Sequence, residues 1–183
     1  ETIWDARPDV IVETGVARGG SVIFSAAMLT LCGGGSVIGV DIDIRAHNRE
    51  TIEHHPMAKN ITLIEGDSTL PETFKRIKEN IPQGSKVMVV LDSDHSFQHV
   101  YNELNLYKDL VTPGQYLVVA DTLLGYLSKE ETPLDRSHVW YPGNEPLSAV
   151  NQFLAENDDF FRDIEMNAKL ILSSNVGGYL KRR

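Results

Sequence analysis

Two carboxylates and two imidazoles follow an uninterrupted apolar run in the middle of the chain. Residues 87–91, VMVVL, are predicted to form a buried strand, and Asp92, Asp94, His95 and His99 come directly after it. Such groups are costly to remove from water unless they are paired, hydrogen-bonded or bound to a cation. The stretch therefore predicts either a polar structural cluster or a functional site at the carboxyl end of this strand.

A later apolar run supplies a partner for Asp92. Residues 115–121, QYLVVAD, form another predicted strand, and it ends at Asp121. If the two strands are neighbours, their terminal carboxylates lie roughly 5 Å apart and repel unless a proton or a cation sits between them. Oxygen ligands favour Mg²⁺ or Mn²⁺ over zinc. The pattern thus predicts a divalent-cation site, and pairing with a basic residue is the alternative.

A glycine-rich turn, ETGVARGGS at residues 13–21, joins a strand at 9–14 to a helix at 21–31, with Ser21 as the expected N-cap. Glycines at such a turn let the backbone approach a ligand closely. The dinucleotide fingerprint is excluded because position 17 is alanine, and no P-loop lysine follows. Glu13 would repel a pyrophosphate and attract a cation such as a sulfonium-bearing amino acid. The alternative is an ordinary strand-to-helix turn.

Acidic residues end the next two predicted strands. Asp41 and Asp43 lie two residues apart in the strand at 36–43, so both are expected on one side, where such folds hold ribose hydroxyls. Asp67 and Ser68 follow the strand that begins at Ile61, and they are suited to hydrogen bonds with an adenine edge. Taken singly, each pair is equally consistent with a helix cap or a turn.

The order of the elements predicts the architecture that positions these residues. Five successive strand–helix units predict a parallel sheet with helices on both faces. The strands are expected at 9–14, 36–43, 61–67, 86–92 and 115–121, and the helices at 21–31, 45–55, 71–80 and 96–110. Residues 122–145 are irregular. A helix at 147–157 and apolar segments at 160–166, 169–174 and 178–182 predict a closing antiparallel edge.

Length and charge restrict the function classes. A chain of 183 residues suits a single domain, and because it opens at Glu1 without methionine an upstream segment is expected to be missing. The net charge of −9 argues against nucleic acid or an anionic membrane as a partner, and no apolar stretch reaches 18 residues. One cysteine, Cys32, excludes an internal disulfide and favours the cytoplasm.

Five motifs in order, ETGVARGGS, GVDID, IEGDS, LDSDHSFQHV and VVADT, resemble the cephalosporin hydroxylase/rhamnosyl O-methyltransferase-like family. The resemblance implies an α/β fold: a Rossmann-like class I methyltransferase sandwich, mostly parallel with an antiparallel C-terminal edge. It implies S-adenosylmethionine as cofactor and Mg²⁺ or Mn²⁺ as metal. The resemblance places residues of the glycine-rich turn and of the acidic strand ends in the cofactor site. These residues are Glu13, Gly15, Ala17, Gly19, Ser21, Asp41, Asp43, Asp67 and Ser68.

The same resemblance makes Asp92 and Asp121 metal ligands and His95 the base. Family members commonly carry glutamate where this chain has Ala120, so either the metal site is weaker or Asp94 completes it. The predicted reaction is methyl transfer to a hydroxyl of a small molecule or a sugar-bearing metabolite. The acceptor is expected to contact residues 122–145, and the chain is expected to form a homo-oligomer.

Two other functions compete with methyl transfer. Asp92, His95 and His99 could form the facial ligand set of an Fe(II) hydroxylase, although such a site explains neither Glu13 nor Asp41. A ligand-binding relative that has lost the chemistry is the second alternative, and Ala120 is the residue that supports it.

Overall fold

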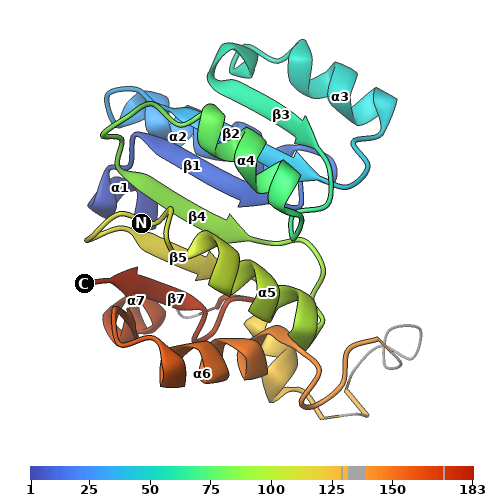
Figure 1. The fold of residues 1–183 in the computed structure, drawn as a ribbon, viewed down its shortest axis with the longest axis vertical. Helices are drawn as coiled ribbons and strands as arrows, with labels where there is room; N and C mark the ends of the chain where they lie inside the picture. Colours follow the sequence, from blue (N-terminus) through green and yellow to red (C-terminus); the bar gives the residue numbers. More distant parts are fainter. Residues whose placement is uncertain (129, 132–138, 171) are drawn as a thin grey trace.

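The chain forms one seven-stranded sheet with helices on both of its faces (Figure 1). The computed structural model describes residues 1–128, 130–131, 139–170 and 172–183. The strand order is β3-β2-β1-β4-β5-β7-β6. The strands are β1 (Val10–Thr14), β2 (Ser36–Asp41), β3 (Ile61–Glu65), β4 (Val87–Leu91), β5 (Tyr116–Val119), β6 (Phe160–Arg162) and β7 (Tyr179–Arg182).

The helices divide between the two faces, so the central strands are buried on both sides and begin or continue with apolar runs such as VMVVL in β4 rather than alternating. Val10 and Val12 pack in one core cluster with residues of α4, α5 and α6, whereas Ile11 between them packs in another with residues of α1, α2 and α7. The helices are α1 (Thr2–Ala6), α2 (Gly20–Leu31), α3 (Ala46–Glu53), α4 (Pro71–Glu79), α5 (Phe97–Tyr107), α6 (Pro146–Glu156) and α7 (Ile164–Lys169). The short 3-10 helices η1 (Ala58–Asn60) and η2 (Thr122–Tyr126) complete the described elements.

The register of the central strands brings the predicted site residues to one edge. β1 to β5 are parallel neighbours, with Thr14 beside Leu91 and Leu91 beside Val119. The residues that follow these strands, Asp92 and Asp121 included, therefore emerge at the same carboxyl edge. β7 runs antiparallel to β5 and β6 antiparallel to β7, so the predicted mixed sheet with an antiparallel C-terminal edge is confirmed.

Some local predictions were wrong or incomplete. The segment 160–166 was expected in a strand of the closing edge, but β6 ends at Arg162 and α7 begins at Ile164, because Asp163 caps α7 by accepting a hydrogen bond from Met166 N at 2.9 Å. The segment 169–174 was expected in the same edge, but its described residues lie outside every strand. The short helix α1 was missed. Ser21 is not an N-cap: it lies inside α2, whose N-cap is Gly19.

The parallel strands are also shorter than predicted, since their polar last residues lie in loops beyond the sheet. β2, for example, ends at Asp41 rather than at residue 43. In the described part of 122–145, the chain forms η2 and an isolated antiparallel bridge between Tyr141 and Asn144, and Pro133 and His138 lie outside the described residues. Across the described part of the chain, no helix combines the length and the apolar character needed to cross a membrane.

Candidate functional site

A cavity of about 460 Å³ opens at the carboxyl edge of the sheet, within the size range of cofactor sites. Its walls come from the loops that follow β1, β2, β3 and β4, which are the places where the sequence motifs fall. The lining residues are Gly15, Ala17, Val40, Asp41, Ile42, Asp67, Ser68, Asp92, Ser93, Asp94, His99 and Trp140.

The glycine-rich turn forms one wall and is tightly constrained. Gly15 has φ +87°, and a Cβ atom there would lie 1.9 Å from the carbonyl oxygen of Asp92, so only glycine fits between β1 and β4. Gly19 has φ +83° and sits against Ile52. Ala17 also has positive φ, 44°, which is strained for a residue with a side chain.

Asp41 holds this strained turn in place. Its Oδ2 accepts hydrogen bonds from Val16 N at 2.9 Å and from Ala17 N at 3.0 Å, and its Oδ1 accepts one from Asp43 N at 3.1 Å. Each carboxylate oxygen has two acceptor positions, so Oδ1 keeps one for a ligand hydroxyl. Asp43 does not line this cavity: residue 43 is exposed and lines an adjoining polar cavity with Arg18 and Arg45, which shares Ala17 and Asp41 with the first.

Glu13 lies buried behind the turn with 1% of its surface exposed. Its carboxylate accepts a short hydrogen bond from the Ser21 hydroxyl, which is what Ser21 does in place of capping the helix. Burial raises the pKa of Glu13 to about 7, the Ser21 hydrogen bond opposes the rise, and the charge of Asp92 adds to it. A nearby cation would favour the charged form of such a buried carboxylate, whose pKa is raised.

The loop after β3 contributes Asp67 and Ser68, as predicted. Asp67 Oδ1 accepts hydrogen bonds from Thr69 N at 2.8 Å and from Thr69 Oγ1 at 2.7 Å, and these bonds hold the pKa of Asp67 below its ordinary value. Ser68 is buried, and its carbonyl oxygen accepts a hydrogen bond from the Tyr107 hydroxyl at 2.9 Å. The loop is thereby fixed to α5.

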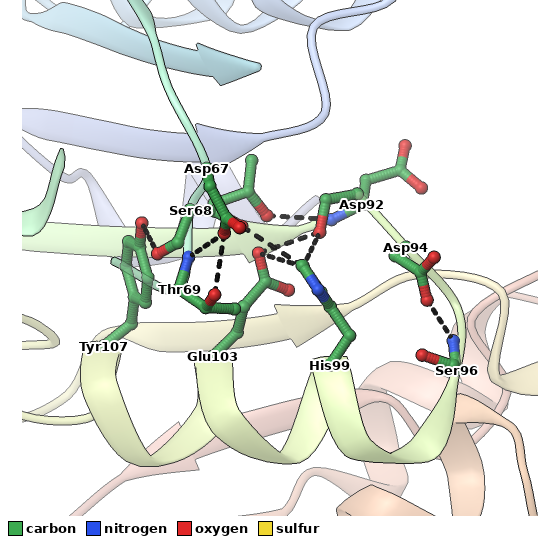
Figure 2. Close-up of polar contacts among 11 residues, drawn as sticks. Asp67, Ser68, Thr69, Asp92, Asp94, Ser96, His99, Glu103 and Tyr107 are labelled. Carbon is green, nitrogen blue, oxygen red and sulfur yellow. Dashed lines mark hydrogen bonds and ion pairs between the residues drawn. The ribbon is translucent and has the colours of Figure 1, made fainter. Parts of the chain in front are cut away.

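A second polar network, which the sequence analysis missed, lies beneath this loop (Figure 2). His99 and Glu103 rise from α5 toward Ser68. His99 Nε2 lies 3.2 Å from Ser68 Oγ, 3.0 Å from Ser93 Oγ and 3.5 Å from Glu103 Oε1. Burial alone would lower the pKa of His99, but the Glu103 carboxylate raises it above the ordinary value. The signal available in the sequence was the four-residue spacing of His99 and Glu103.

Asp92, which lines the cavity, lies close to His95 and Asp121. One ligand atom from each lies within 4.8 Å of the others, and His95 Nε2 lies 3.3 Å from Asp121 Oδ2. The His95 ring packs edge-on against Trp140, with ring centroids 5.2 Å apart. Burial raises the pKa of Asp92 to about 6, with His95 acting against the rise and the charges of Asp121 and Glu103 acting with it.

Asp94 and His99 lie outside this cluster among the residues the structure describes. Asp94 Oδ1 accepts a hydrogen bond from Ser96 N at 2.7 Å, so it fixes the start of α5. The position where the family commonly has glutamate, Ala120, is buried and offers no ligand atom. The cluster therefore presents two carboxylates and one imidazole, and Asp94 is not brought in as a further ligand.

Comparison with known proteins decides the family. Residues 1–183 match the family described as Rhamnosyl O-methyltransferase/CmcI. The chain belongs to this family. A rhamnosyl O-methyltransferase of Mycobacterium leprae is 29% identical over 190 residues, which cover 100% of this chain and 75% of that protein.

Solved structures show the same fold. A complex of CmcI with Mg and S-adenosylmethionine aligns with a TM-score of 0.61 at 24% identity, over 99% of this chain and 67% of that one. The methyltransferase MycE from the mycinamycin pathway, in complex with Mg and S-adenosylhomocysteine, aligns with a TM-score of 0.56 at 20% identity, over 84% of this chain and 40% of that one. The predicted class I methyltransferase fold is confirmed.

Membership of the rhamnosyl O-methyltransferase/CmcI family also decides between the competing predictions. It favours O-methyl transfer over the hydroxylase. The geometry agrees, because an Fe(II) set of Asp92, His95 and His99 would require His99 to turn away from Ser68, Ser93 and Glu103.

Proposed function

We propose that the chain is an S-adenosylmethionine-dependent, Mg²⁺-assisted O-methyltransferase that acts on a hydroxyl of a small molecule. The observation that carries the proposal is the position of Asp92, which both lines the cofactor-sized cavity and belongs to the cluster with His95 and Asp121. A cofactor in the cavity and an acceptor at the cluster would therefore meet at one residue.

The walls of the cavity suit S-adenosylmethionine better than a dinucleotide. The free acceptor position on Asp41 Oδ1 suits a ribose hydroxyl, and Asp67 and Ser68 suit the adenine edge. Asp92 lines the cavity and Glu13 lies buried behind its glycine-rich turn; in their ionised forms, both would supply negative charge for the methionine portion and repel the pyrophosphate of NAD. When it is bound, S-adenosylmethionine supplies an electrophilic methyl group on a sulfonium.

Asp92 and Asp121 fit a divalent cation, since a carboxylate oxygen of each lies within 4.8 Å of the other, and an imidazole nitrogen of His95 lies within the same distance of both. Asp92 and Asp121 would hold the cation, which supplies positive charge that favours the deprotonated form of an acceptor hydroxyl. Ala120 leaves this set with fewer carboxylates than family members commonly have, so weak binding is expected.

His95 is the proposed general base. A hydroxyl must lose its proton as its oxygen forms a bond to the methyl carbon and the carbon–sulfur bond breaks. His95 accepts that proton on its imidazole, and the Asp121 carboxylate, 3.3 Å from Nε2, stabilises the resulting imidazolium. Packing against Trp140 fixes the orientation of the ring.

The remaining assignments are proposals with narrower support. Leu123, Tyr126 and Tyr141 are exposed and lie in the segment 122–145 that follows Asp121, and such side chains would suit a sugar-bearing metabolite. Exposed Trp4, in the N-terminal helix, supports self-association. The single sheet running through the chain supports a single domain, and the lone free thiol, Cys32, supports a cytoplasmic location.

Calorimetry with S-adenosylmethionine, S-adenosylhomocysteine and NAD tests the proposal. We expect the first two to bind with micromolar affinity and NAD not to bind. Asp41→Ala should weaken cofactor binding by about 10- to 100-fold, because it removes a charged hydrogen-bond acceptor and releases the strained turn. Asp43→Ala is the matched control, since only its backbone contacts Asp41. Binding of NAD alone would refute the assignment, and cofactor binding without methyl transfer to any hydroxyl acceptor would indicate an inactive relative.

A further inference from the structure

Asp121 has an unusual backbone conformation for a residue in a cation cluster. Its φ and ψ are 52° and 25°, in the left-handed region that side chains other than glycine disfavour. Asparagine and aspartate tolerate this region better than other residues, yet it persists only where surrounding contacts fix it. The carboxylate of Asp121 points into the cluster from this strained backbone, so whatever fixes the backbone also fixes the position of the ligand atom.

The segment 173–178, before β7, supplies the fixing contacts. It receives hydrogen bonds from three alternate backbone N–H groups at and beyond the end of β5. Val119 N donates to Gly178 O at 2.8 Å, and Leu123 N donates to Ser174 O at 2.9 Å. Between them, Asp121 N donates to the side-chain oxygen Oδ1 of Asn175 at 3.1 Å. The middle bond is thus the one in this series that depends on a side chain.

Asn175 is itself held rigidly. Its backbone N–H donates to Ser173 Oγ at 3.0 Å, its carbonyl oxygen accepts from Gly178 N at 2.9 Å, and Ser174 Oγ donates to the same Oδ1 at 2.9 Å. It does not line the cofactor cavity. A side chain so constrained is suited to hold one backbone group, rather than to contact a substrate.

We propose that Asn175 is a positioning residue for the cation site: its side-chain oxygen holds Asp121 in the left-handed conformation that aims the carboxylate at Asp92 and His95. This inference rests on the proposed metal-assisted function. Without the Asn175 bond, Asp121 relaxes toward an ordinary backbone conformation, and its carboxylate leaves the cluster. Mutation of a residue that hydrogen-bonds to a metal ligand without contacting the metal typically lowers metal affinity by about 10- to 100-fold.

The test is Mn²⁺ binding, measured by calorimetry on the whole chain for the wild type and two variants. Asn175→Ala should weaken Mn²⁺ binding at least tenfold and leave S-adenosylhomocysteine affinity within about twofold of wild type. Asn167→Ala is the matched control, because Asn167 Oδ1 holds the same segment through Gly177 N at 2.8 Å but does not contact Asp121. It should lower thermal stability to a similar extent and leave Mn²⁺ affinity unchanged.

Two further variants keep the comparison available if Asn175→Ala does not fold. Asn175→Asp keeps an accepting oxygen at the same distance from the backbone and should bind Mn²⁺ at least as tightly as wild type, whereas Asn175→Gln displaces it and should bind weakly. Equal Mn²⁺ affinity in wild type, Asn175→Ala and Asn175→Gln overturns the inference and leaves the proposed function standing. A wild-type chain that binds no divalent cation overturns this inference and the metal part of the proposed function together.

Discussion

Replacing Glu13 with glutamine should stabilise the protein at alkaline pH. In the folded chain the pKa of Glu13 is raised to about 7, chiefly by burial, from an ordinary value of 4.5. Because the folded value lies above the unfolded one, the contribution of Glu13 to stability is fully present below about pH 4.5 and is lost as pH rises through about 7. The difference corresponds to about 3 kcal/mol, since one pKa unit is worth about 1.4 kcal/mol.

Glutamine has nearly the same size and can still accept the hydrogen bond from Ser21, but it carries no charge. We therefore expect Glu13→Gln to raise the free energy of unfolding by about 1–3 kcal/mol at pH 8 and to change it little at pH 4.5. Urea denaturation at several pH values between 4.5 and 8 measures both quantities. The test compares the free energy of unfolding of wild type and Glu13→Gln at each pH, because Asp92 titrates in an overlapping range and affects both proteins.

The matched control is Ser21→Ala. Loss of the Ser21 hydrogen bond removes a contact that favours the charged carboxylate, so this variant should be less stable than wild type by a larger margin at pH 8 than at pH 4.5. In calorimetry at pH 8, Glu13→Gln should bind S-adenosylmethionine more weakly than wild type. A Glu13→Gln protein that is less stable than wild type at pH 8, or equally shifted at every pH, would refute the reasoning.

Two further predictions concern the turn and the base. Gly15→Ala should cost several kcal/mol of stability and abolish cofactor binding, because its Cβ would lie 1.9 Å from the Asp92 carbonyl oxygen. The control variant Gly20→Ala should be nearly neutral, because its Cβ would meet no atom within 4 Å. Thermal denaturation measures the stability of both variants, and calorimetry measures their cofactor affinity. His95→Gln should lower turnover by about 10²- to 10⁴-fold with cofactor affinity unchanged. Full activity in a folded His95→Gln protein would contradict the role of base, and loss of Mn²⁺ binding instead would make His95 a metal ligand.

The architecture was predictable because burial on both faces leaves a clear mark on a strand. The run VMVVL has no polar position, and five mainly apolar runs alternating with helical segments permit few arrangements other than a parallel sheet. The location of the site followed from the same reasoning. Once the strands are parallel, the residues after them meet at one edge, so Asp41, Asp67, Asp92 and Asp121 had to gather there.

The contacts that were not predictable depend on one side chain or on distant segments. Residues 160–174 contain apolar residues that suit either a strand or a helix, and the cap at Asp163 decides in favour of α7. Ser21 was assigned to a helix cap because its partner, Glu13, is brought to it only by the fold. Asn175 reaches Asp121 across 54 positions of the chain, and no local pattern indicates such a contact.

Charge connects the site to its proposed ligands. In a chain of net charge −9, the carboxylates of Glu13, Asp92 and Asp121 gather at one edge of the sheet, and the pKa values of Glu13 and Asp92 are both raised. Burial is the main cause of both shifts, and the neighbouring carboxylates add to them, so the ionised forms of Glu13 and Asp92 are disfavoured there. A sulfonium, an α-ammonium group and a divalent cation each favour these ionised forms, whereas a pyrophosphate disfavours them. The same residues would thus favour the proposed cofactor and the proposed metal, which is why neutralising Glu13 should stabilise the fold and weaken cofactor binding together.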